Sequence, residues 1–74
     1  MFNINGYYWN IKLVSPNHYE LLQKNETYAL GACNAIKKTI YLSENIPKNK
    51  LKKVLCHEIT HAAMFSYNIL LNED

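Results

Sequence analysis

A helical periodicity of apolar residues from position 48 to about position 67 constrains the fold of this chain more than any other feature. The apolar residues recur at steps of three and four, which is the spacing of one face of an α-helix. They are Leu51, Val54, Leu55, Ile59, Ala62 and either Phe65 or Ser66. Ser43 to Asn45 can cap this helix, and Pro47 lies near its first turn. We therefore predict a long helix that packs one face on the rest of the chain.

The N-terminal residues predict a β-hairpin. The strand-like runs 2–4 and 7–14 flank Asn5-Gly6, and both of these residues tolerate the positive φ of a type I′ turn. The second run alternates with a period of two, so that Tyr7, Trp9, Ile11 and Leu13 share one face. This alternation is typical of a half-buried strand.

A second hairpin is predicted from residues 27–33 and 38–42, with a turn at Asn34-Ala35. Between the hairpins, Ser15 could cap a short helix that begins at Pro16, directs Tyr19, Leu21 and Leu22 inward, and ends at Lys24-Asn25. The predicted fold class is α+β: a small antiparallel sheet of two β-hairpins packed against the C-terminal helix. The chain of 74 residues is short enough to form a single small domain, 1–74.

Composition excludes several classes of protein. A hydrophobic content of 49% argues against disorder, and a net charge of +2 is too small to indicate nucleic-acid binding. Two cysteines, Cys33 and Cys56, are fewer than a disulfide-stabilised secreted domain of this size carries, so free thiols and a cytoplasmic location are expected. The start of the chain lacks the pattern of a signal peptide, and the longest apolar run near the C-terminus, 62–65, is too short to span a membrane.

Four lysines crowd the start of the predicted helix: Lys48, Lys50, Lys52 and Lys53. The cluster is typical of a solvated helix start. A phosphate-binding patch is the alternative interpretation.

The helix carries an HExxH motif, His57-Glu58-Ile59-Thr60-His61. Residues four apart lie on one helical face, so both imidazoles can reach one metal ion. Glu58 lies beside them, where a carboxylate can act as a general base on a metal-bound water rather than as a ligand. The motif indicates a zinc metallopeptidase, with His57 and His61 as zinc ligands and Glu58 as the catalytic base.

A catalytic zinc usually takes three protein ligands, and the motif supplies two. Residues 62–68 contain neither a glycine nor a third histidine, which excludes the extended pattern of the metzincins. Glu73 is a weak candidate for the third ligand, Asp74 a weaker one, and His18 a remote one that fits a surface residue better. Cys56 points about 100° away from His57 and is expected to be a small buried residue.

These residues resemble a known family. Residues 39–43 (TIYLS) and 51–62 (LKKVLCHEITHA), with 4–11 (INGYYWNI) and 28–31 (YALG), look like the small phage- and mobile-element-type zinc metallopeptidases of the ImmA/IrrE-like group. The resemblance implies zinc held by the two motif histidines and an acidic residue of a later helix. It also implies cleavage of a regulatory protein such as a repressor. This sequence ends where that later helix should begin, so an N-terminal portion of a longer domain is also expected.

Three interpretations of function follow. The first is a zinc-dependent endopeptidase, or a truncated form of one. The second is a catalytically incomplete module of the same family that binds a protein partner without hydrolysis. The third is a zinc-bridged oligomer, in which a neighbouring chain supplies the missing ligand.

Overall fold

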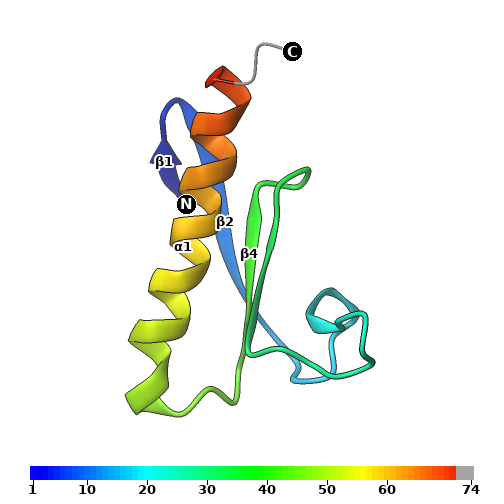
Figure 1. The fold of residues 1–74 in the computed structure, drawn as a ribbon. Coiled ribbons are helices and arrows are strands. Elements are labelled where there is room, and N and C mark those ends of the chain that lie inside the picture. The colour runs from blue at the N-terminus through cyan, green and yellow to red at the C-terminus, as the bar shows by residue number, and fades with distance from the viewer. Residues whose placement is uncertain (72–74) are drawn as a thin grey trace.

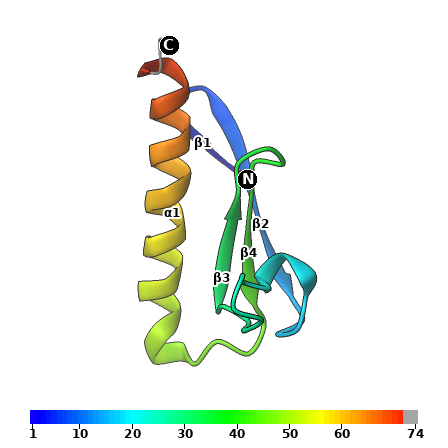
Figure 2. The same ribbon diagram turned by 45° about the vertical axis from the view of Figure 1, so that its right-hand side comes forward.

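The computed structural model describes the backbone of residues 1–71 and the side chains of residues 1–67. A four-stranded sheet forms one layer, and a long helix lies across one of its faces (Figure 1; Figure 2). The strands are β1 (Phe2–Ile4), β2 (Tyr7–Val14), β3 (Gly31–Asn34) and β4 (Thr39–Ser43), the helix is α1 (Lys48–Leu71), and a 3-10 turn, η1 (Tyr19–Leu21), lies between β2 and β3. The predicted α+β class and the long helix are confirmed.

The first hairpin forms where the sequence predicts it. Asn5 and Gly6 have φ values of 52° and 89°, so both adopt the positive φ that a type I′ turn requires. The side chain of Asn3 also accepts a hydrogen bond of 3.0 Å from the Gly6 N–H. The local turn chemistry therefore fixes the register of β1 against β2.

The sheet is mixed, so the prediction of a purely antiparallel sheet is wrong. Each hairpin is antiparallel, but the strand order is β1-β2-β4-β3 and the two hairpins join through a parallel pairing of β2 with β4. Parallel neighbours need a long crossover connection. Here residues 15–38, which include η1 and β3, return the chain so that β4 starts beside Asn10 and runs in the same direction as β2.

The segment between the hairpins is less regular than predicted. The expected short helix is only the turn η1, and β3 begins at Gly31 instead of residue 27. Backbone groups in this segment bond to one another: the Gln23 N–H donates to the Thr27 carbonyl, and the Ala29 N–H to the Leu21 carbonyl. Leu21 is buried as predicted, but the exposed side chains of Tyr19 and Leu22 are not directed inward.

The hydrophobic core lies between α1 and the centre of the sheet. Its buried members are Trp9, Ile40, Leu42 and Ala62. The indole N–H of Trp9 donates a hydrogen bond of 2.9 Å to the hydroxyl of Ser66, which is fully buried. Ser66, rather than the half-exposed Phe65, therefore occupies the inward position at this level of the helix.

The C-terminal half of β2 runs away from α1 (Figure 1; Figure 2). Ile11 and Leu13, predicted on the half-buried face, are consequently 40% and 67% exposed. The alternating pattern predicted the strand correctly, but the position of the helix over the sheet decides which part of its apolar face is covered.

None of the helices among residues 1–71 combines the length and apolar character needed to cross a membrane.

Candidate active site

The two histidines of the motif converge on one point. His57 is exposed and His61 half-buried, and their Nε2 atoms lie 3.0 Å apart. The rings meet nearly edge to face, with an interplanar angle of 82°. The four-residue spacing on α1 places both rings at the border of the buried face, as the sequence predicts.

This pair of nitrogens fits a shared metal ion. Two ligand nitrogens of a tetrahedral zinc, each 2.0–2.1 Å from the ion, are about 3.3 Å apart. The Nε2 atoms of His57 and His61 are 3.0 Å apart, and a small rotation of either ring would bring them to that separation. Without a metal, two Nε2 lone pairs at this distance would repel each other, unless one ring carries its proton on Nε2 and donates it to the other. The donor set therefore suits zinc, although it also suits other divalent ions.

Glu58 is directed into the protein. Its side chain is only 7% exposed, yet it has no hydrogen-bond partner among the described side chains, and neither oxygen is sealed from solvent. Burial raises the pKa of the Glu58 carboxyl, and the nearby His61 and His57 lower this pKa in part. A carboxylate that is desolvated, unpaired and still accessible is suited to accept a proton.

The buried position of Glu58 could have been found in the sequence. The predicted apolar stripe passes through Val54 and Ala62, and position 58 lies four residues from each. A charged residue in the middle of an apolar stripe indicates a buried carboxylate. The HExxH motif predicts Glu58 beside the metal, but it does not indicate that this side chain lies in the helix–sheet interface.

Gly31 of β3 creates the space that Glu58 occupies. A Cβ atom at this position would lie 2.9 Å from Cγ1 of Val54 and 3.1 Å from Cγ of Glu58. Any larger residue would push α1 or the Glu58 side chain away from the sheet. The glycine thus acts as a positioning residue, and only its lack of a side chain matters here.

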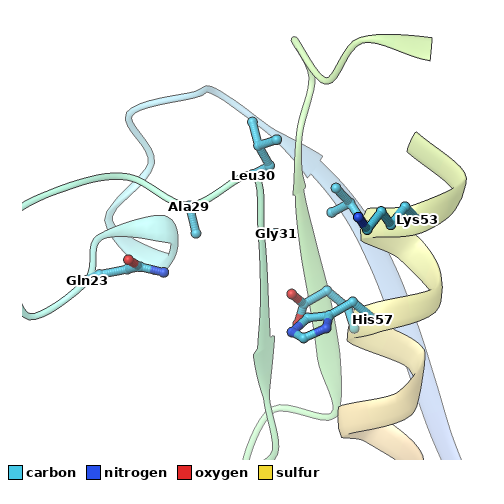
Figure 3. Close-up of a pocket in the computed structure, with 8 residues that line it drawn as sticks. Gln23, Ala29, Leu30, Gly31, Lys53 and His57 are labelled. Carbon is cyan, nitrogen blue, oxygen red and sulfur yellow. The ribbon is translucent and has the colours of Figure 1, made fainter. Parts of the chain in front are cut away.

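A groove runs along β3 and passes the motif. It consists of two adjoining cavities of about 360 and 340 Å³ that share Gln23, Ala29, Gly31, His57 and Glu58. Figure 3 shows Gln23 on one side of β3 and His57 on the other, with β3 between them. The first cavity continues to Leu30, Lys53 and Val54, and we call it the Val54 subsite. The second continues towards Cys33, His61 and Phe65.

β3 is the last strand in the order of the sheet, so one of its edges has no strand beside it among the described residues. The Ser43 N–H donates to the Leu30 carbonyl, and bonding alternates along an antiparallel pair. Ala32 and Asn34 therefore bond towards β4, while the backbone groups of Gly31 and Cys33 point to the free edge. This edge borders the groove.

Neither cysteine is placed as a metal ligand. Cys33 is half-buried, and burial together with the nearby Glu58 raises the pKa of its thiol to about 11. Cys56 is exposed, so the prediction that it is buried is wrong. On α1, position 56 is rotated about 160° from the buried Glu58 and about 120° from the buried Ala62, so its side chain faces away from the sheet. Both thiols are free, as expected.

His18, the remote ligand candidate, has a structural role. Its Nδ1 accepts a hydrogen bond of 3.0 Å from the Glu20 N–H at the start of η1, and its ring stacks on Tyr41. Glu73 and Asp74 lie outside the described residues. Within the described part of the chain, no group of three His, Cys, Asp or Glu side chains could hold a metal ion. The two-histidine pair is therefore the metal-binding candidate.

No protein-family model, no curated protein and no solved structure matches this chain. The function of the site must therefore be inferred from its own geometry.

Proposed function

We propose that this chain is a zinc-dependent endopeptidase, or a part of one, in which His57 and His61 hold the metal and Glu58 is the general base. The observation that carries the proposal is the approach of the two Nε2 atoms to 3.0 Å directly beside a buried, unpaired carboxylate. A solvated helix face would leave the glutamate in water. Here the structure accommodates it at an energetic cost, which is typical of functional carboxylates.

A bound zinc would supply an acidified water and an electrophilic contact for the carbonyl of a peptide bond. Glu58 would take a proton from the attacking water and deliver it to the leaving amine. The raised pKa of Glu58 favours this exchange, because a carboxyl that is easily protonated can also return the proton. His57 and His61 would hold the metal through their Nε2 atoms.

The free edge of β3 can hold the substrate. A peptide in extended conformation can add to a sheet edge through backbone hydrogen bonds, here to Gly31 and Cys33. The added strand would run along the groove and pass Glu58. Backbone pairing ignores side chains, so this mode suits an unfolded segment of a protein substrate. The resemblance to the ImmA/IrrE-like group implies that this substrate is a regulatory protein such as a repressor. A cytoplasmic setting is part of this proposal.

The test combines metal content with cleavage. Zinc binding is measured by isothermal titration on protein treated with chelator, and hydrolysis on a library of unstructured peptides. We expect one zinc per chain, loss of binding in His57→Ala, and unchanged zinc binding with cleavage at least about 100-fold slower in Glu58→Gln. Cleavage at the wild-type rate in Glu58→Gln would overturn the proposal.

The second candidate is a module that binds a peptide without hydrolysing it. It is favoured by the finding that only two metal-binding side chains meet among the described residues. It predicts peptide binding that is the same in wild type and Glu58→Gln, with no cleavage by either. A zinc-bridged oligomer, completed by a ligand from a neighbouring chain, instead predicts that a chelator lowers the oligomeric state in sedimentation.

A further inference from the structure

Among the residues that the structure describes, the lysine cluster at the start of α1 has no partner that compensates for its charge. Lys48, Lys50, Lys52 and Lys53 are all exposed, and none forms an ion pair with a residue of the described part of the chain. The first turn of α1 contains no acidic residue. Cations at this end of a helix oppose its dipole, and Lys48 and Lys52 repel each other at a spacing of four. An anionic ligand would relieve this repulsion.

The cluster reaches the groove through Lys53. Lys53 lines the Val54 subsite from the helix side, one helical turn before His57, and Leu30 lines it from the side of β3 (Figure 3). The subsite therefore combines an apolar lining with a cation at its border. A free phosphate inside the subsite would meet the apolar side chains of Leu30 and Val54 and, at the motif end, the Glu58 carboxylate. The lining therefore favours a ligand that places an apolar group in the subsite and a negative charge at its Lys53 border.

The direction of β3 orients such a ligand. β3 runs in the same direction as α1. Its first residue, Gly31, lies against Val54, and Cys33, two residues later, shares a cavity with His61. Antiparallel strand pairs are two to three times as common as parallel ones. A peptide antiparallel to β3 would therefore leave the groove, with its C-terminal end, past the Val54 subsite and towards the lysines.

We propose that the groove selects an extended peptide with an apolar residue in the Val54 subsite, on the C-terminal side of the bond beside Glu58, followed by acidic residues that Lys53 and the neighbouring lysines attract. This inference rests on the proposed function for the position of the cleaved bond. Lys53 is the specificity-determining residue. Leu30 and Val54 provide the apolar contact.

Binding can be tested without hydrolysis. The full chain with Glu58→Gln is titrated in chelator with three fluorescent peptides that differ only at three central positions: a leucine and two glutamates, a leucine and two lysines, or a serine and two glutamates. The first peptide should bind at least about tenfold more tightly than the second, the sum of two or three favourable charge contacts. Replacing leucine by serine should weaken binding about fivefold or more.

A matched pair of charge reversals tests whether Lys53 causes the preference for the acidic peptide. Lys53→Glu should reduce the preference for the acidic peptide about three- to tenfold. Lys12→Glu, which changes the net charge equally at an exposed position of β2 and outside the groove, should change it less than about twofold. Equal effects of the two reversals, equal affinity for acidic and basic peptides, or no binding of any peptide would overturn the inference.

These outcomes are separable from failure of the proposed function. If wild-type protein with zinc cleaves acidic and basic peptides equally well, the specificity of the groove is contradicted and the endopeptidase function is supported. If the acidic preference is found but zinc induces no cleavage, the specificity of the groove is supported and the endopeptidase function is contradicted.

Discussion

The side of α1 that faces the sheet buries two polar side chains, Ser66 in its C-terminal half and Glu58 in its N-terminal half, in different ways. Near the C-terminal end, the buried Ser66 hydroxyl accepts a hydrogen bond from Trp9. About two turns earlier, the buried Glu58 carboxylate has no such partner among the described residues. The first contact fixes the helix on the sheet. The second leaves a strong acceptor free in a groove, and the difference separates the part of the interface that stabilises the fold from the part suited to chemistry.

The same contrast holds for the neighbouring residues. Ala62 is fully buried beside the core residues Trp9 and Ile40. At the level of Glu58, the sheet offers Gly31 instead, so the space is filled by the carboxylate side chain rather than by an apolar group of β3. A small domain has little stability to spare, so the firmly packed half must offset the cost of the other.

The largest effect that separates the halves is expected from Glu58→Gln. Removal of the general base should lower zinc-dependent peptide hydrolysis about 100- to 10,000-fold. In metal-free protein the same change should raise the free energy of unfolding at neutral pH, because it removes a desolvated charge. Activity assays and urea denaturation check the two outcomes. A less stable variant would show that the carboxylate stabilises the fold, which would contradict the difference between the two halves of the interface.

Ser66→Ala should have the opposite profile. The Trp9 N–H would lose its partner in the core, which costs about 1–3 kcal/mol of unfolding free energy. Zinc affinity of the folded protein should stay unchanged. Thr60→Ala is the control, because it removes an exposed hydroxyl from the same helix. This hydroxyl donates a hydrogen bond to the Cys56 carbonyl, which contributes little to the free energy of unfolding. Urea denaturation that gives equal losses for both variants would contradict a special role of the buried pair.

Gly31→Ala tests the boundary between the halves. The new Cβ would lie 2.9 Å from Cγ1 of Val54 and force a shift, with an expected loss of about 1–2 kcal/mol from overpacking. The new Cβ would also lie 3.1 Å from Cγ of Glu58 and displace the general base. The rate of hydrolysis should therefore fall more than the zinc affinity does. The two values are measured by peptide cleavage and calorimetry. A fall in zinc affinity with retained turnover would instead indicate a displaced histidine.

The smallest effect is expected in the pH dependence of stability. Folding raises the pKa of Glu58 above its ordinary value of 4.5, so the folded state binds the proton more tightly than the unfolded state. The carboxyl therefore costs no stability at a pH below 4.5, and the cost appears as the pH rises through the folded pKa. In metal-free protein, the stability advantage of Glu58→Gln over wild type should grow over this range. Chemical denaturation of both proteins at several pH values measures it, and an advantage that shrinks with pH would contradict the raised pKa.

Features encoded by neighbouring residues were predictable from the sequence. The turn at Asn5-Gly6 depends only on which residues tolerate positive φ, and the structure has it. The convergence of His57 and His61 follows from the four-residue spacing on a helix, whatever the helix packs against. The register of the first hairpin and the position of the motif at the border of the buried face are local in the same sense.

Features that depend on packing between distant segments were not predictable in the same way. Turn residues specify which strands form each hairpin, but nothing between Ser15 and Lys38 specifies that β4 joins β2 in parallel. The same long-range packing exposes Leu13 and shortens the expected helix to η1. Propensity and alternation describe single elements, whereas these three outcomes depend on how the helix, the loop and the two hairpins meet.

Trp9 is the single tryptophan of the chain, and it lies at the junction of helix and sheet with its indole fully enclosed. Its fluorescence therefore reports the docking of α1 without any added label. Emission from an indole in this apolar setting shifts to longer wavelength when water reaches it. Strand β2 thus carries an optical sensor for the docking of the motif helix, and one spectrum can distinguish an undocked α1 from a docked α1 whose chemistry has been disabled.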